Sequence, residues 1–148
     1  MIYQSNSDIQ TKKIAQALAQ KLLSSPKLKV LALTGNLGVG KTTFAQGFAK
    51  GLGIKERIIS PTFILMRQHH IPKTSKVFYH LDLYRLDNPQ EIKELGLSDL
   101  FNTNGMVLIE WAEKIEDKLP QQTIKIRLEK TSINGRKITI EDLKLHGL

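Results

Sequence analysis

The chain has 148 residues, enough for one domain and too few for a second hydrophobic core of useful size. It contains no cysteine, which excludes disulfides, thiolate zinc sites and a cysteine nucleophile. Hydrophobic residues make up 41% and charged residues 24%, as in an ordinary globular protein. The net charge of +8 suits contact with nucleic acid or with an acidic protein, and it equally suits a well-solvated surface.

No segment has the pattern of a membrane or export signal. The first thirteen residues are polar and lack the apolar region of a signal peptide. The longest apolar stretches, such as Val30–Leu33 and Met106–Ile109, are far too short to cross a bilayer. We therefore expect a cytoplasmic protein with no membrane partner.

The first third of the chain predicts a helix, a strand and a second helix. Residues 9–23 have apolar side chains at about every fourth position, which indicates an amphipathic helix, and Ser7 or Asp8 could cap it. Lys27–Thr34 is expected to be a strand that becomes buried. Thr43–Lys50 is expected to be a helix that ends near Gly51 and Gly53. A glycine-rich segment lies between this strand and the second helix.

The rest of the chain predicts five strands and one short helix. The helix starts at Asn88, with Pro89 at its first position, and ends at Gly96. Asn134-Gly135 is a turn signal between the last two strands, which should pair as a hairpin. The expected strands are Thr62–Gln68, Lys76–Leu81, Met106–Ile109, Ile124–Leu128 and Lys137–Ile140.

The glycine-rich segment is a complete P-loop pattern. It consists of Gly35, Asn36, Leu37, Gly38, Val39, Gly40, Lys41 and Thr42. In such a loop the backbone N–H groups surround an anion, the lysine reaches the β- and γ-phosphates, and the threonine hydroxyl faces Mg²⁺. Because a strand precedes it and a helix follows, we predict that this chain binds a nucleotide with Mg²⁺.

The placement of the loop also predicts the fold class. We expect an α/β, P-loop NTPase-like three-layer fold in one domain over residues 1–148. Its central mixed sheet would carry helices on both faces and a C-terminal antiparallel hairpin.

Two carboxylates follow predicted strands and could complete the site. Asp82 comes after the strand at 76–81, and Glu110 comes after the fully apolar strand at 106–109. Ligands of open α/β sheets bind at the carboxyl ends of strands, and a P-loop enzyme needs an acid there to hold Mg²⁺. The competing interpretation is that each is a solvated loop carboxylate.

Four segments occur in this order and at these spacings: Gly35–Phe44, Ser60-Pro61-Thr62-Phe63, His80-Leu81-Asp82-Leu83-Tyr84-Arg85-Leu86 and Leu108-Ile109-Glu110-Trp111. Together they resemble the TsaE family (formerly YjeE), the ATPases of bacterial tRNA threonylcarbamoyladenosine synthesis, which implies that the nucleotide is ATP. Asn36 departs from the family, which commonly has an acid there, and we expect little loss of binding from it.

The resemblance implies a role for each matching residue. Thr43 would lie near the α-phosphate, and Thr62 would be a switch-like threonine near the γ-phosphate and Mg²⁺. Asp82 and Glu110 would be the carboxylates of Mg²⁺ and water, with Thr42 and Glu110 nearest the metal. Arg136 would reach the nucleotide, unless it is a solvated hairpin arginine.

The resemblance also implies a function and partners. The chain would be an ATPase that supports TsaD-like and TsaB-like proteins in modifying adenosine 37 of tRNA, meeting tRNA only indirectly through that complex. Two alternatives stay open. One is a nucleotide-sensing module with little turnover, and the other is a small-molecule kinase, for which the segment at 86–104 lacks an arginine-bearing lid.

Other conspicuous side chains receive structural interpretations. Adjacent residues such as His69 and His70 point to opposite faces of a strand, and His80 and His146 complete no metal-ligand spacing. Trp111 is expected to form a wall beside the site.

Overall fold

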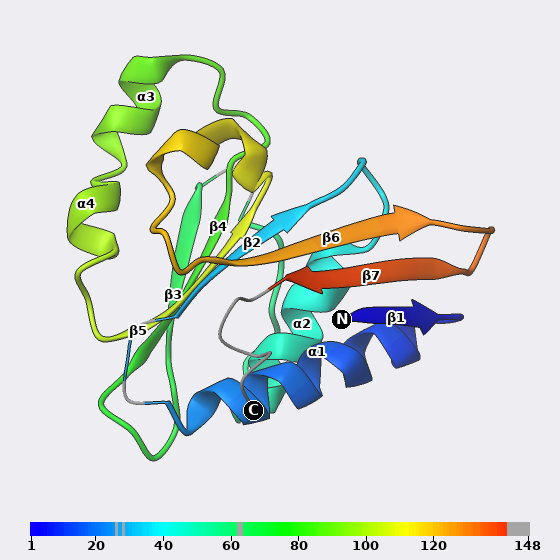
Figure 1. Cartoon of the computed structure of the whole chain (residues 1–148). Coiled ribbons are helices and arrows are strands. Elements are labelled where there is room, and N and C mark those ends of the chain that lie inside the picture. Colours follow the sequence, from blue (N-terminus) through cyan, green and yellow to red (C-terminus); the bar gives the residue numbers. More distant parts are fainter. Residues whose placement is uncertain (26, 28, 62–63, 142–148) are drawn as a thin grey trace.

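The computed structural model describes residues 1–25, 27, 29–61 and 64–141, and their strands form one sheet (Figure 1). The strand order is β1-β7-β6-β2-β5-β4-β3. Strands β4, β5, β2 and β6 run parallel, and β3, β7 and β1 join antiparallel at the two sides. The strands are β1 (Ile2–Ser5), β2 (Lys29–Thr34), β3 (Met66–His70), β4 (Val77–Asp82), β5 (Gly105–Glu110), β6 (Ile124–Lys130) and β7 (Arg136–Glu141).

Helices cover both faces of this sheet. On one face lie α1 (Asp8–Leu23) and α2 (Lys41–Gly51), which pack against each other. On the other lie α3 (Pro89–Glu94), α4 (Leu97–Leu100) and the 3₁₀ helix η1 (Ala112–Lys118), as Figure 1 shows. The predicted three-layer α/β arrangement is confirmed.

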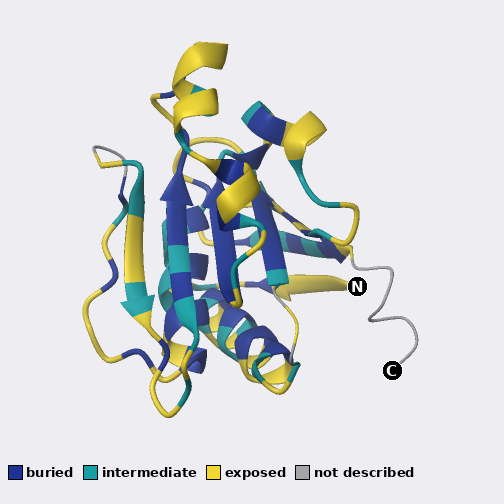
Figure 2. Cartoon of the chain, turned by 90° about the vertical axis from the view of Figure 1, so that its left-hand side faces the viewer, coloured by how far each residue is buried: buried dark blue, intermediate teal, exposed yellow. Residues whose placement is uncertain are grey.

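Alternation along the central strands supplies a separate core to each face. In β2, Leu31 and Leu33 belong to the core beneath α1 and α2, which also contains Phe44 and Phe48. Val30 and Ala32 of the same strand belong to the core on the other face. The central strands are therefore buried along most of their length (Figure 2), as expected for parallel strands covered on both sides.

Local sequence signals set the start of two helices as predicted. The Ser7 side chain accepts a hydrogen bond from the backbone N–H of Gln10 at 3.1 Å, capping α1. The Asn88 side chain accepts one from the N–H of Glu91 at 2.9 Å, and Pro89 occupies the first turn of α3.

Other boundaries differ from the prediction. The strand expected over 62–68 begins only at Met66 and continues to His70. Before it, the N–H groups of Ile64 and Leu65 both donate to Pro61 O, and Leu65 has φ 68°, so these two residues do not belong to the strand. Residues 62 and 63 lie outside the described part.

Three elements were not predicted. Strand β1 is short and mostly exposed, and it pairs with β7 from the far end of the chain. Gly96, at φ 67°, ends the short helix as expected, but α4 follows it directly. Helix η1 follows Trp111, which has φ 60°. None of the helices in the described part of the chain is both long and apolar enough to cross a membrane.

Candidate functional site

The P-loop joins the end of β2 to the start of α2 and depends on glycine at defined positions. The backbone φ angles of Gly35, Gly38 and Gly40 are 148°, 77° and 109°, values that residues other than glycine rarely adopt. A Cβ on Gly35 would also lie 2.6 Å from the backbone oxygen of Leu128 in β6. The loop therefore passes against the neighbouring strand before it turns into the helix.

Lys41, the first residue of α2, is 5% exposed. Its ammonium group donates to Gly35 O and, at 3.1 Å, to Asn36 O. It also lies 4.0 Å from the centre of the Trp111 ring, a cation–π arrangement. Burial lowers the pKa of Lys41, and the negative charges of Glu110, Glu113 and Asp82 oppose that shift.

The two predicted carboxylates are neighbours. Asp82 ends β4 and Glu110 ends β5, and the parallel register places them directly opposite each other. Both are almost fully buried, at 3% and 2% exposure. The expectation that these strands bring their terminal acids to one edge is met, and neither is a solvated loop residue.

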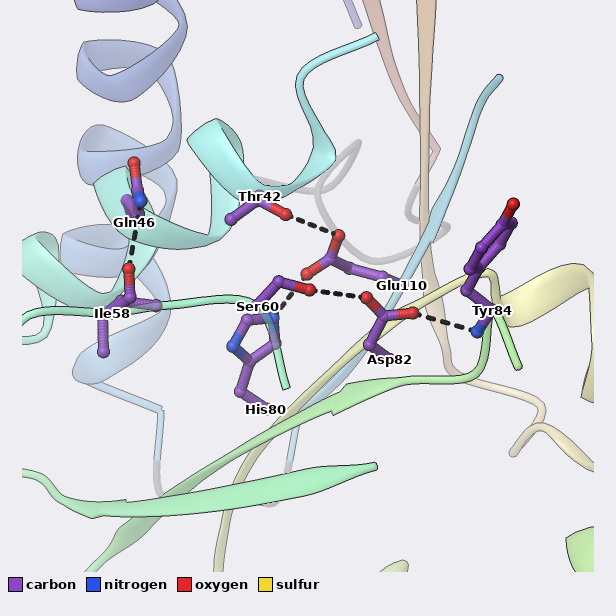
Figure 3. Close-up of polar contacts among 8 residues, drawn as sticks. All are labelled: Thr42, Gln46, Ile58, Ser60, His80, Asp82, Tyr84 and Glu110. Atoms are coloured by element: carbon purple, nitrogen blue, oxygen red, sulfur yellow. Dashed lines mark hydrogen bonds and ion pairs between the residues drawn. The ribbon is translucent and has the colours of Figure 1, made fainter. Parts of the chain in front are cut away.

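Each carboxylate is held by hydrogen bonds, several of which Figure 3 shows. Glu110 accepts from the Thr42 hydroxyl at 3.1 Å and pairs with His80 Nε2 at 2.6 Å. Asp82 accepts from the Ser60 hydroxyl at 2.7 Å and from the backbone N–H of Tyr84 at 2.9 Å. The P-loop threonine thus contacts the acid of the neighbouring strand.

These side chains surround a cleft of about 290 Å³. Trp111 and Tyr84, whose ring centres are 5.1 Å apart, form one wall, as expected for Trp111. The lining residues are Leu37, Gly38, Gly40, Lys41, Thr42, Thr43, Ser60, Asp82, Tyr84, Glu110 and Trp111.

The polar side chains of the cleft suit a Mg²⁺ ion bound to phosphate. Mg²⁺ in phosphate-binding sites takes one or two carboxylates and completes its shell with phosphate oxygens and water. Thr42 and Glu110 supply a hydroxyl and a carboxylate within 3.1 Å of each other. No three His, Cys, Asp or Glu side chains of the described residues form a separate metal-binding cluster.

Two sequence-predicted residues, Arg136 and Thr62, contribute differently or cannot be placed. The Nε of Arg136 donates to Val39 O of the P-loop at 2.8 Å, and its Nη1 donates to carbonyls of its own turn, including Gly135 O at 2.8 Å. Arg136 thus contacts the backbone of the P-loop and is not one of the residues that line the cleft. Thr62 lies outside the described residues.

Sequence reasoning missed two contributors, His80 and Ser60. His80 completes no metal-ligand spacing in the sequence, yet it is fully buried and contacts Glu110. The available signal was its position two residues before Asp82, since alternate residues of a strand share a face. Ser60 sits in an irregular segment, and nothing local to it indicates contact with Asp82.

Known proteins are similar to this chain in sequence and fold. The family model described as "Threonylcarbamoyl adenosine biosynthesis protein TsaE" matches residues 5–138. The "tRNA threonylcarbamoyladenosine biosynthesis protein TsaE" of Bacillus subtilis (strain 168) is 42% identical over 113 residues, covering 74% of this chain and 67% of that protein. The protein of the same name from Rickettsia felis is 42% identical over 137 residues, covering 91% of this chain and 76% of its own.

A solved structure gives the same result for the fold. The crystal structure of Bacillus subtilis YdiB superposes with a TM-score of 0.78 and 34% identity, covering 97% of this chain and 85% of that one. The family model spans most of the chain. The alignments with the two relatives also include two thirds or more of each relative's length. The chain therefore belongs to the TsaE family of tRNA threonylcarbamoyladenosine biosynthesis proteins.

Proposed function

We propose that this chain binds ATP with Mg²⁺ in the cleft and hydrolyses it in support of tRNA threonylcarbamoyladenosine synthesis. The observation that carries the proposal is the convergence of Lys41, Thr42, Asp82 and Glu110 on one cleft at the end of the parallel strands. Chance carboxylates on a surface would not be buried in register beside a P-loop.

Each group has a defined task in this proposal. The P-loop N–H groups and Lys41 bind the phosphates. Thr42 and Glu110 hold Mg²⁺, which when bound neutralises charge on the phosphate oxygens. Asp82 and Glu110 present carboxylate oxygens that orient a water molecule and accept its proton. Trp111 and Tyr84 exclude bulk water from one side of the cleft.

The biological setting comes from the family. Its members are named for tRNA threonylcarbamoyladenosine biosynthesis, and we propose that this chain acts there with TsaD-like and TsaB-like proteins. It would meet tRNA only indirectly through that complex, in the cytoplasm.

One observation favours an alternative, a nucleotide-sensing module with little turnover. The ammonium of Lys41 is folded onto the P-loop carbonyls, and both site carboxylates accept hydrogen bonds from protein groups. These contacts must rearrange before the groups can act on a nucleotide and water. Such a site would bind ATP and hydrolyse it slowly on its own.

Steady-state phosphate release and ATP binding separate the two functions. The wild-type chain should bind ATP only weakly without Mg²⁺, and it should release phosphate faster when the TsaD-like and TsaB-like pair is added. Binding without phosphate release, with and without the pair, would support the sensing module. No binding at all would contradict both.

A further inference from the structure

We propose that His80 is a positioning residue for Glu110. Its Nε2–H holds one oxygen of the Glu110 carboxylate, so that the other oxygen stays at Thr42 and the cleft. The inference rests on the proposed ATPase function, and it concerns a residue to which that function gives no role.

The sheet brings His80 to Glu110 without any loop. His80 lies two residues before Asp82 on β4, so both side chains project to the same face. Because Asp82 and Glu110 are opposite each other on adjacent strands, His80 is the diagonal neighbour of Glu110. The resulting contact, between His80 Nε2 and Glu110 Oε2, is 2.6 Å long.

The two oxygens of Glu110 have different partners. Oε2 faces His80, which is fully buried, and Oε1 faces the hydroxyl of Thr42 at the cleft. An ionised carboxylate only accepts hydrogen bonds, so the hydrogen between His80 and Glu110 belongs to Nε2. The imidazole thus fixes the plane of the carboxylate from its buried side.

Among the described residues, the ring of His80 makes a hydrogen bond through Nε2 only. Its Nδ1 is buried and meets no hydrogen-bond partner in the described residues. The ring lies against Phe78, with centres 6.1 Å apart and planes 16° from parallel, so packing sets its orientation. Among the described residues, the contact with Glu110 is therefore the hydrogen bond that the ring of His80 makes.

The neighbouring strand offers a matched control. His69 of β3 stacks on the same Phe78, with ring centres 6.2 Å apart, and it too has a buried nitrogen without a partner among the described residues. Its other nitrogen pairs with Glu56, whose side chain is 65% exposed and lies outside the cleft lining. Removing His69 therefore imitates the packing change at His80 without touching a site carboxylate.

The test compares His80→Ala, His80→Gln and His69→Ala with the wild type, in the presence of the partner pair. Four quantities are measured: kcat, the Kd for ATP, the Mg²⁺ concentration that half-saturates nucleotide binding, and Tm. Glutamine places an amide N–H at the distance of the histidine Nε2 from the backbone. It should therefore restore the donor that alanine removes.

We expect His80→Ala to lower kcat by about 10–100-fold, the usual effect of losing a group that orients a site ligand. Its half-saturating Mg²⁺ concentration should rise, while the Kd for ATP at saturating Mg²⁺ changes little. His80→Gln should restore most of the kcat and most of the Mg²⁺ affinity. His69→Ala should change neither quantity, even if its Tm falls as much as that of His80→Ala.

Three outcomes would overturn the proposal: wild-type kcat and Mg²⁺ dependence in His80→Ala, equal losses in His69→Ala, or no recovery in a folded His80→Gln. If the wild type binds nucleotide but hydrolyses none, the proposed ATPase function fails by itself. The Mg²⁺ dependence of binding then still decides whether His80 positions Glu110.

Discussion

The charge of Lys41 depends on the anions around it. The residue as a whole is nearly buried, and burial is the largest influence on the pKa of Lys41, which it lowers. Glu110, Glu113 and Asp82 act in the opposite direction by favouring the charged form. A phosphate group in the cleft would add a further anion, so phosphate binding and the protonation of Lys41 should support each other.

Lys41→Ala should abolish measurable nucleotide binding while the chain stays folded. The ammonium touches two loop carbonyls and the Trp111 ring, so its removal should change the free energy of unfolding by only about 1 kcal/mol. Nucleotide titration beside a thermal melt measures both effects. Lys50→Ala, an exposed lysine of the same helix, is the control and should bind normally. Wild-type affinity in folded Lys41→Ala would remove the P-loop from the proposed site.

Glu110→Gln and Asp82→Asn should affect turnover more than binding. Both changes keep the size of a buried side chain and remove the charge that would face Mg²⁺ and water. We expect kcat to fall about 100-fold or more, while the Kd for ATP changes only a few-fold. Single-turnover kinetics and equilibrium titration separate the two quantities. Unchanged kcat in both variants would show that these carboxylates have no part in the chemistry.

At the scale of elements, the position of the P-loop helix depends on how closely α1 approaches α2. Gly47 and Gly51 of α2 face the backbone of α1. A Cβ on Gly47 would lie 2.4 Å from Lys12 O, and one on Gly51 would lie 2.5 Å from Gln16 O. Small residues thus let the two helices pack backbone to backbone. This contact positions the helix that begins at Lys41.

Gly47→Ala should destabilise the protein despite the higher helix propensity of alanine. Propensity favours the change by about 1 kcal/mol. Overpacking against a rigid backbone costs about 1–3 kcal/mol or more, and a 2.4 Å contact is severe, so the steric effect should dominate. Urea denaturation measures the net effect. Gln20→Ala on the exposed side of α1 controls for helix propensity, and a stabilised Gly47→Ala variant would mean that the helices separate easily.

At the scale of the whole molecule, positive charge gathers in a groove that shares no lining residue with the candidate site. A groove of about 760 Å³ along α1, α2 and the segment after α2 is lined by Lys12, Lys50, Lys55 and Arg57. Glu56, its one acidic lining residue, is paired with His69. Four basic residues and one acidic residue therefore line this groove, which suits an acidic partner surface.

We expect weak ATPase activity from the chain alone and clear stimulation by the TsaD-like and TsaB-like pair. A group supplied by a partner can accelerate P-loop enzymes by about 10³–10⁵-fold. Arg136 of this chain does not supply such a group in the cleft, because its guanidinium is hydrogen-bonded to Val39 O of the P-loop. Stimulation should weaken as salt rises, because exposed charges are screened beyond a Debye length of about 10 Å at 0.1 M. Phosphate release across a salt series, with and without the pair, measures this.

Variants of the groove extend that prediction. Lys50→Gln with Lys55→Gln should raise the concentration of partner needed for half-maximal stimulation and flatten its salt dependence. Lys93→Gln with Lys118→Gln removes the same charge from the other face of the sheet and should change neither. Equal phosphate release with and without the pair would make this chain a self-sufficient ATPase.

The sequence alone determined those features that depend on neighbouring residues. The P-loop, the caps at Ser7 and Asn88 and the buried strand before Glu110 all follow from local patterns. The end of β4 at Asp82 was predictable for the same reason. Since parallel strands end at a common edge, these patterns also implied that the two acids would meet.

Only the tertiary structure decided which distant groups complete the site. Strand β1 exists because β7 pairs with it across almost the whole chain, and four residues carry too little pattern to predict that. The hydrogen bond from Arg136 to Val39 and the contact of His80 with Glu110 depend on strand order and register. A residue's own neighbours say nothing about which strand lies beside it, so these contacts are properties of the folded sheet.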